Sequence, residues 1–480
     1  MRFAYTIVMK RVEKLLSNFA TPEILVNRSL EVAGRKSVLI YNPDLTDGEL
    51  LSELVKSLFK VKRIKGLADL LSVSVAVTES KIESDEAKSQ EAVLCGDAVL
   101  FVEKEDNFLV CTVRKWDKRA IAEPPTGSVT KGPREGFIED VKTNLSLLAR
   151  RLKSPHFAVE KLQIGRFSKT TVAVAYLSNV APKRIVRKIK HRLKKIDTDG
   201  IIDSYYLQPY LEDKPYSVFH QTGVTEKPDI VTAKLLEGRV AIIVDGSPMV
   251  LTLPFMLVED YQSGIDYYER PVLASFLRLL RVTALFFAIF LPGLYVALQQ
   301  YHYNTIPLRF LITVMTAVNG IPFSPLSEIL FVIILFELIK EAGVRMPRAV
   351  GMAMSIVGAL VLGDTAVKAG IISSPAVMIT ALSSIALFTA PNQEGTFTIL
   401  RIVFTLLGGL GGMYFLLCGA LYLVHYLCSM NGYGVPYTAP FAPLVLSDLK
   451  DSVYRVNLRD MTDRPKSLRS RNKIRRGKEE

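Results

Sequence analysis

Charged residues are scarce between residues 271 and 428, and four of them lie among apolar neighbours, where chemistry is expected first. They are Glu328, Glu337, Asp364 and Lys368. A charge at membrane depth is expensive, so such a side chain should face protein or water and commonly marks an ion or substrate path. Asp364 and Lys368 stand four residues apart, on one face of a helix, where they can form an ion pair.

The segment that contains this pair is rich in small residues, which let helices approach closely. They are Gly351, Ala353, Ser355, Gly358, Ala359 and Gly363. The polar face of such a helix could line a pore, with the ion pair holding it closed, or the two charges could simply pair. The candidates for a pore or gate are Glu337, Ser355, Gly358, Asp364 and Lys368. A GxxxG at Gly408 and Gly412 indicates close packing, with a hinge as the alternative.

Motifs for catalysis are missing from the sequence. The five histidines are isolated, and there is no HExxH, no Walker loop, no GxGxxG after a strand and no GxSxG. Adjacent carboxylates such as Glu259 and Asp260 are common on surfaces. The four cysteines show no metal-ligand spacing, which fits a reducing compartment and structural roles. We therefore expect no enzyme activity, no catalytic residue, no cofactor and no metal site.

The distribution of charge divides the chain into a soluble part and a membrane part. No Lys, Arg, Asp or Glu occurs at 282–308, 369–393 or 402–447, whereas the first 270 residues carry charge throughout. An apolar helix of about 20 residues crosses the hydrocarbon core of a bilayer. We expect an α+β cytosolic part, made of two α/β subdomains, followed by an α-helical multi-pass membrane domain.

Local patterns place the boundaries within this scheme. Residues 37–41, 98–102 and 108–113 have strand composition, and two strands at 157–164 and 170–177 followed by a helix open a second subdomain. The predicted divisions are an N-terminal segment at 1–30, subdomains at 31–153 and 154–270, a membrane domain at 271–446 and a basic cytoplasmic tail at 447–480.

Block lengths and charges predict about four crossings with additional re-entrant or interfacial pieces. The soluble part and the tail, which has eight basic and no acidic residues from Arg464 to Lys478, both belong on the cytoplasmic side, so the number of crossings must be even. We expect no secretory signal peptide at the start. The blocks are 273–298, a pair at 308–318 and 329–339 that makes one crossing, 349–370, a partial segment at 375–390, and 399–428.

A net charge of +13 and a basic helix at 182–196 raise the question of nucleic acid. In that helix Ile185, Ile189, Leu193 and Ile196 form an apolar stripe, and most of the remaining surface is basic. This basic surface is interpreted first as a solvated helix face. The alternative is a functional one, in which the helix contacts the anionic inner leaflet of the membrane. No aromatic interleaving or binding motif accompanies the charge, so we expect no nucleic-acid partner.

Six segments carry a family resemblance. They are EPPTGSVTKGPREGF (123–137), TEKPDIVTAKLLEGRVAIIVDGSP (225–248), QSGIDYYERP (262–271), LPGLYVAL (291–298), FELIKEAGVRMPR (336–348) and VGALVLGDTAVKAGIISSP (357–375). On these segments the chain resembles the GerA-type spore germination proteins of endospore-forming bacteria, over most of residues 120–440. Residues 1–110 and the NQEGTF after Pro391 depart from the family pattern, which leaves the receptor subtype open.

The resemblance implies the A subunit of a germinant receptor, or a close paralogue. Such subunits are understood to form a homo-oligomeric ring, a pentamer, that acts as a ligand-gated cation channel in the spore inner membrane. They work with a transporter-like B subunit that recognises the germinant and with a lipoprotein C subunit. A secondary transporter and a membrane-anchored scaffold are the alternatives, although no internal repeat supports the first and the charges in apolar blocks argue against the second.

Two of the family segments hold further candidate residues. GPREGF has the composition of a rigid loop that opens a helix, with Arg134 and Glu135 available to a neighbouring subunit or for packing within their own domain. Four other residues stand just before the first crossing, where aromatic rings favour the headgroup level. They are Asp266, Tyr267, Tyr268 and Arg270. We expect a membrane-entry joint there, either an anchor or a gating joint.

Overall fold

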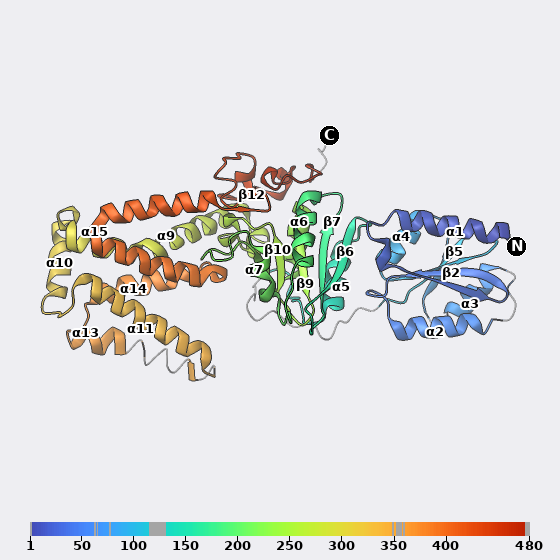
Figure 1. Cartoon of the computed structure of the whole chain (residues 1–480), viewed down its shortest axis with the longest axis horizontal. Coiled ribbons are helices and arrows are strands. Elements are labelled where there is room, and N and C mark those ends of the chain that lie inside the picture. The colour runs from blue at the N-terminus through green and yellow to red at the C-terminus, as the bar shows by residue number, and fades with distance from the viewer. Residues whose placement is uncertain are drawn as a thin grey trace.

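The computed structural model describes residues 2–61, 64, 66–75, 78–114, 131–347, 350, 351, 358 and 361–475. Three parts follow one another along the long axis of the molecule (Figure 1). They are unit 1 (residues 2–114), unit 2 (residues 131–270) and a helical unit (residues 271–429). An α+β part followed by helices is the predicted order.

Unit 1 is a five-stranded sheet with helices on both faces. Its strands lie in the order β1 (Val26–Val32), β2 (Arg35–Tyr41), β4 (Ala98–Val102), β5 (Phe108–Cys111) and β3 (Ser80–Glu83), each antiparallel to its neighbour. In β2, Val38 and Ile40 pack with α1 (Arg2–Ser17) and α4 (Glu86–Leu94), while Leu39 packs with α2 (Gly48–Phe59) and α3 (Leu67–Val75). A continuous apolar strand buries both of its faces in this way, because side chains alternate.

Unit 2 repeats this plan. Its antiparallel strands lie in the order β6 (Phe157–Ile164), β7 (Thr170–Leu177), β9 (Val240–Val244), β10 (Val250–Leu253) and β8 (Gly223–Thr225). One face packs against α5 (Val141–Arg151) and α8 (Pro228–Glu237), and the other against α6 (Lys183–Lys194) and α7 (Gln208–Leu211). The stripe predicted for α6 is confirmed at Ile185, Ile189 and Leu193, which are buried.

The helical unit contains α9 (Pro271–Tyr301), α10 (Leu308–Val318), α11 (Pro325–Arg345), α13 (Ala366–Lys368), α14 (Ser374–Leu387) and α15 (Glu394–Ser429), with a π-helical turn at Val361–Thr365. In the part of the chain that the structure describes, two helices are long and apolar enough to cross a membrane, α9 and the 394–428 part of α15 when it is counted through its break at Gly411 and Gly412. α11 has 21 residues and is longer than the predicted block at 329–339, because Ser324 caps its start and a Glu341–Arg345 pair supports its charged end.

α15 is folded back on itself. Gly411 and Gly412 leave the helical conformation, Gly412 with a φ of +61°. A Cβ on Gly419 would lie 2.6 Å from the Leu407 side chain, although a straight helix would separate these residues by about 18 Å. The single crossing predicted at 399–428 is therefore two antiparallel arms, residues 394–410 and 413–429, joined by a glycine hinge (Figure 1).

After α15 the chain returns to unit 2. Two short strands follow, β11 (Asn431–Gly432) and β12 (Val435–Pro436). Tyr433 and Leu468 are buried in the core of unit 2, and Arg464 Nε donates to the Leu236 carbonyl oxygen at 2.6 Å. Residues 430–446, predicted as membrane domain, and the described part of the predicted tail thus pack on unit 2. The basic composition of the tail suggested a solvated segment. Buried apolar side chains and hydrogen bonds to carbonyl oxygens of unit 2 attach it instead.

We predict that Gly408→Ala destabilises the helical unit by about 1–3 kcal/mol. A Cβ there would lie 2.2 Å from the carbonyl oxygen of Gly293 in α9, a backbone atom that cannot move aside. The thermal midpoint of the detergent-solubilised chain measures the effect. Gly395→Ala is the control in the same helix, because nothing lies within 4 Å of its Cβ position. Equal midpoints for the two variants would contradict the close contact of α9 with α15.

Candidate functional site

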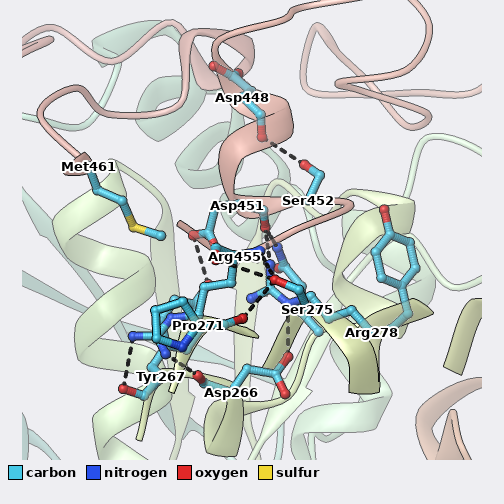
Figure 2. Close-up of polar contacts among 12 residues, drawn as sticks. Asp266, Tyr267, Pro271, Ser275, Arg278, Asp448, Asp451, Ser452, Arg455 and Met461 are labelled. Carbon is cyan, nitrogen blue, oxygen red and sulfur yellow. Dashed lines mark hydrogen bonds and ion pairs between the residues drawn. The ribbon is translucent and has the colours of Figure 1, made fainter. Parts of the chain in front are cut away.

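The chain enters the helical unit through a joint that three segments build. These are residues 260–270 of unit 2, the first three turns of α9, and residues 448–455 of the returning segment (Figure 2). We call the residues Asp266, Tyr267, Arg278, Asp451 and Arg455 the membrane-entry joint. The segment that precedes the helical unit in the sequence and the segment that follows it therefore meet at this joint.

Asp266 is the carboxylate at the centre of the joint, and it has no exposed surface. Its Oδ2 accepts hydrogen bonds from Arg278 Nε and Arg281 Nη1, both at 2.9 Å, and its Oδ1 accepts one from Arg281 Nη2 at 2.8 Å. The Ser263 N–H donates to Oδ2 at 3.2 Å, which closes the turn before α9. Two arginines three residues apart on α9 therefore hold one carboxylate of unit 2.

Arg278 extends the joint to the returning segment. Its side chain is fully buried, and Nη1 donates to the Asp451 carbonyl oxygen at 2.6 Å and to Asp451 Oδ1 at 3.1 Å. Tyr267 donates from its hydroxyl to Asp451 Oδ2 at 2.9 Å. A buried guanidinium is tolerated when its charge is paired and its donors are bound. Asp266 and Asp451 together meet that need, although Nη2 has no partner among the described residues.

Arg455 binds the backbone of the turn that leads into α9. Its Nη1 donates to the carbonyl oxygens of Asp266, at 2.7 Å, and Glu269, and its Nη2 to that of Tyr267 at 3.3 Å. The Tyr267 ring lies near two cations, with Arg278 Cζ 5.7 Å and Arg455 Cζ 5.6 Å from its centroid. The returning segment thereby fixes the direction in which α9 leaves unit 2.

Burial and pairing set the charge state of the joint. Burial alone would raise the pKa of Asp266, but hydrogen bonds from Arg281 and Arg278 outweigh it and hold that pKa below its ordinary value. Burial, with the nearby Asp451 carboxylate, raises the pKa of Tyr267 well above its ordinary value, so the phenol stays a donor. At neutral pH the carboxylate of Asp266 is therefore ionised and the phenol is protonated.

Of the four residues predicted for the joint, Asp266 and Tyr267 take part directly. Tyr268 lies at its edge and donates to Asp229 Oδ2 of α8 at 2.7 Å. Arg270 is the exposed N-cap residue of α9, and its side chain makes no capping hydrogen bond. Sequence reasoning placed Arg278 at the inner end of the first crossing but did not connect it to Asp451, because 173 positions separate the two residues and no local pattern connects them. It did not single out Asp451 or Arg455.

The loop of Arg134 and Glu135 lies beside the joint. Glu135 binds two arginines of α5, Arg150 and Arg151. Gly132, with a φ of +112°, packs so closely on Tyr268 that a Cβ would lie 2.7 Å from its ring. Glu135 thus has a role within its own chain, as the alternative interpretation expected. The Arg134 side chain is exposed, and its contact with a neighbouring subunit stays a prediction.

A second network of charges lies inside the helical unit. Glu337 Oε1 of α11 accepts from Arg401 Nη2 of α15 at 2.6 Å, and Arg401 Nη1 donates to Ser384 Oγ of α14 at 2.8 Å. Lys340 pairs with Glu337 at 2.5 Å and with Glu394 at 3.0 Å. Arg401 is fully buried. Within one copy Arg401 therefore links α11, α14 and α15, with Glu337 as its partner on α11, and the role of Glu337 at a pore stays a prediction.

The other pore candidates lie apart from this network. Lys368 Nζ lies 2.7 Å from Asp364 Oδ1, and both side chains are more than half exposed, which confirms the predicted ion pair. A Cβ on Gly358 would lie 2.9 Å from Ile339 Cδ1 of α11. Ser355 lies outside the described residues. Within those residues, no group of three or more His, Cys, Asp or Glu side chains could hold a metal ion.

The chain matches the family described as Bacillus/Clostridium GerA spore germination protein over residues 12–467. It is 36% identical to spore germination protein KA of Bacillus subtilis (strain 168), over 92% of this chain and 82% of that protein. Spore germination protein A1 of the same bacterium is 32% identical over 94% of this chain and 93% of that protein. The uncharacterized membrane protein YfkQ, also from this bacterium, is 37% identical over 83% of this chain and 78% of that protein. Among solved structures, the N-terminal domain of the A subunit of the Bacillus megaterium spore germinant receptor GerK3 covers 51% of this chain and 92% of that chain, with 26% identity and a TM-score of 0.38.

We predict that Asp266→Asn destabilises the chain by about 3–5 kcal/mol, because it leaves Arg281 without a counter-charge and the buried Arg278 with Asp451 as its remaining counter-charge. Thermal unfolding of the purified full-length chain at neutral pH measures the change. Asp197→Asn is the matched control, since Asp197 pairs with Arg166 where both side chains are more than 60% exposed. That variant should leave the midpoint unchanged.

The pH dependence of the stability difference between wild type and Asp266→Asn tests whether the ionised carboxylate of Asp266 causes it. The pKa of Asp266 is lower in the folded chain, so its contribution is full above the ordinary aspartate pKa of about 4 and is lost as the pH falls through the folded value. The gap between wild type and Asp266→Asn should hold from neutral pH to about pH 5 and shrink below about pH 4. No gap at neutral pH would contradict the buried pair.

Proposed function

Because the chain belongs to the GerA family of Bacillus and Clostridium spore germination proteins, we propose that it is an A-type subunit of a germinant receptor that conducts cations. Two of the relatives named above, spore germination proteins KA and A1, are spore germination proteins by name. In this proposal several copies form a ring, a pentamer, in the spore inner membrane. Binding of a nutrient germinant by partner subunits of the B and C types opens a path for monovalent cations.

The contacts at the two ends of the helical unit support a multi-pass arrangement. At the end nearest unit 2, Gln393 Nε2 donates to Asp260 Oδ2 at 2.5 Å, before the first arm of α15. At the far end, the Tyr301 hydroxyl, where α9 ends, donates to the Gly409 carbonyl oxygen at 2.9 Å. The first arm of α15 therefore runs beside α9 and reaches its far end. An arm of 17 residues is about 25 Å long, close to the hydrocarbon core of a bilayer.

The observation that carries the channel proposal is the π-helical turn Val361–Thr365, which contains Asp364. π-Helical turns are rare and are frequently found at functional sites. Asp364 and Lys368 expose 55% and 75% of their side chains, although the neighbouring helices are apolar. Water, or a second copy, is the environment that such charges need. A pore shared between copies provides both.

We predict that Asp364→Ala raises the basal efflux of K⁺ or Na⁺ from liposomes that contain the purified full-length chain. The variant removes the pair that holds the π-turn segment in its closed position. Glu341→Ala is the matched control, because Glu341 and Arg345 form another exposed pair four residues apart in the same unit. The control should leave the efflux unchanged.

Two outcomes of this measurement would count against the proposal. Equal efflux from wild type, Asp364→Ala and Glu341→Ala would remove the π-turn segment from the path. Flux that saturates with ion concentration and needs a counter-substrate would favour a secondary transporter. The mass of the detergent-extracted complex separates the two classes further, since a single copy cannot form the ring.

A further inference from the structure

Exposed large side chains concentrate in one short stretch of unit 2. Among the described residues before Pro271, eleven large apolar or tyrosine side chains are exposed, and six of them lie within residues 202–218. They are Ile202, Tyr205, Tyr206, Tyr210, Tyr216 and Val218. Soluble surfaces usually expose such residues singly, and a concentration of them indicates an interaction site. Tyr216 is 100% exposed, so nothing within a single copy explains its presence.

The end of this stretch is attached to both arms of α15. The Val218 carbonyl oxygen accepts a hydrogen bond from Thr396 Oγ1, in the first turn of the first arm. At the end of the second arm, the Tyr426 hydroxyl donates to Ser217 Oγ at 2.9 Å, and Lys214 Nζ donates to Ser429 Oγ at 2.9 Å. Residues 214–218 therefore lie at the level where both arms meet unit 2.

Tyr210 precedes this loop on the same side of unit 2. It belongs to α7, which lies on the side of unit 2 that faces the helical unit (Figure 1). The carbonyl oxygen of the next residue, Leu211, accepts from the hydroxyl of Tyr433, four positions after the last residue of α15, at 2.7 Å. α7 and the loop after it are thus held next to the point where α15 ends.

The outer face of the second arm ends next to the loop at residues 214–218, which contains Tyr216. It carries exposed apolar or tyrosine side chains along its length, and it ends at Ser429 beside Lys214. The exposed residues are Tyr414, Phe415, Leu417, Leu421, Tyr422 and Val424. An apolar face of this kind contacts acyl chains when the arm is embedded, and the layer reached next is the headgroup region, where tyrosine rings are favoured.

We propose that Tyr210, Tyr216 and Val218 form a lipid-contact patch that rests in the headgroup layer of the membrane leaflet next to unit 2. The inference rests on the proposed function, because it takes the arms of α15 as membrane-embedded. The patch holds unit 2 against the bilayer surface at the level of the membrane-entry joint. Its ligand is phospholipid, and the continuity with the apolar face of the second arm selects it over a protein partner.

Tryptophan fluorescence in brominated lipid tests the patch. The chain has one tryptophan, Trp116, so a Trp116→Phe background leaves each introduced tryptophan as the single reporter. Tyr216→Trp and Tyr210→Trp report the patch. Tyr422→Trp, 71% exposed on the second arm, reports embedding, and Phe59→Trp, 54% exposed at the end of α2 in unit 1, is the remote control. The full-length chain, without partner subunits, is reconstituted in phosphatidylcholine brominated near the headgroup or near the bilayer centre.

The expected result has a definite depth order. Tryptophan at 216 and 210 is quenched by bromine near the headgroup and much less by bromine near the bilayer centre. Tryptophan at 422 is quenched strongly by the deeper bromine, and tryptophan at 59 by neither. Absence of quenching at 216 and 210, with quenching at 422, would overturn the patch and leave the embedding of α15 intact. Absence of quenching at 422 as well would overturn both proposals.

Discussion

The guanidinium of Arg278 has no exposed surface, and the arrangement of the three parts depends on the way its charge is neutralised. A buried ion without partners costs several kcal/mol. One counter-charge, Asp266, comes from unit 2, 12 positions earlier, and the other, Asp451, comes from the segment that follows the whole helical unit. The buried position of Arg278 on α9 therefore depends on two segments, the one that precedes the helical unit and the one that follows it. This requirement connects the fold of unit 2 to the direction of α9.

The charges of the helical unit divide into those that bind helices together and those that stay exposed. Arg401 and Glu337 join α11, α14 and α15, while the backbones of α9 and α15 meet at Gly293 and Gly408. Asp364 and Lys368 lie outside this packed set, next to an irregular helical turn. In the proposed channel, the packed helices carry movement from the joint, and the exposed segment is the part that changes.

Much of the fold follows from patterns that are local in sequence. Strand composition located β2, β4 and β5, and the stripe at Ile185, Ile189 and Leu193 located α6, because a period of two or of 3.6 reports one element at a time. The fold of α15 at Gly411 and Gly412 was harder to predict, because an uncharged helix rich in glycine has the same composition whether it runs straight or turns back.

The candidate site shows the same limit. Asp266 and Tyr267 were predicted from their place before the first crossing, but Arg455 was not, because its partners are backbone carbonyls that carry no sequence signature. The returning segment looked like a solvated basic tail for a related reason. In the part predicted as that tail, Leu468 is one buried apolar side chain among many polar neighbours.

A double-mutant cycle between Arg278 and Asp451 tests most directly whether the joint is one cooperative unit. Thermal midpoints are measured on the purified full-length chain for wild type, Arg278→Met, Asp451→Leu and the double variant. If each residue neutralises the other, the double variant should lose far less than the sum of the two single losses, because replacing both members of a buried pair removes the unpaired charge. Losses that add within error would show that the returning segment and α9 are independent, and would contradict the account.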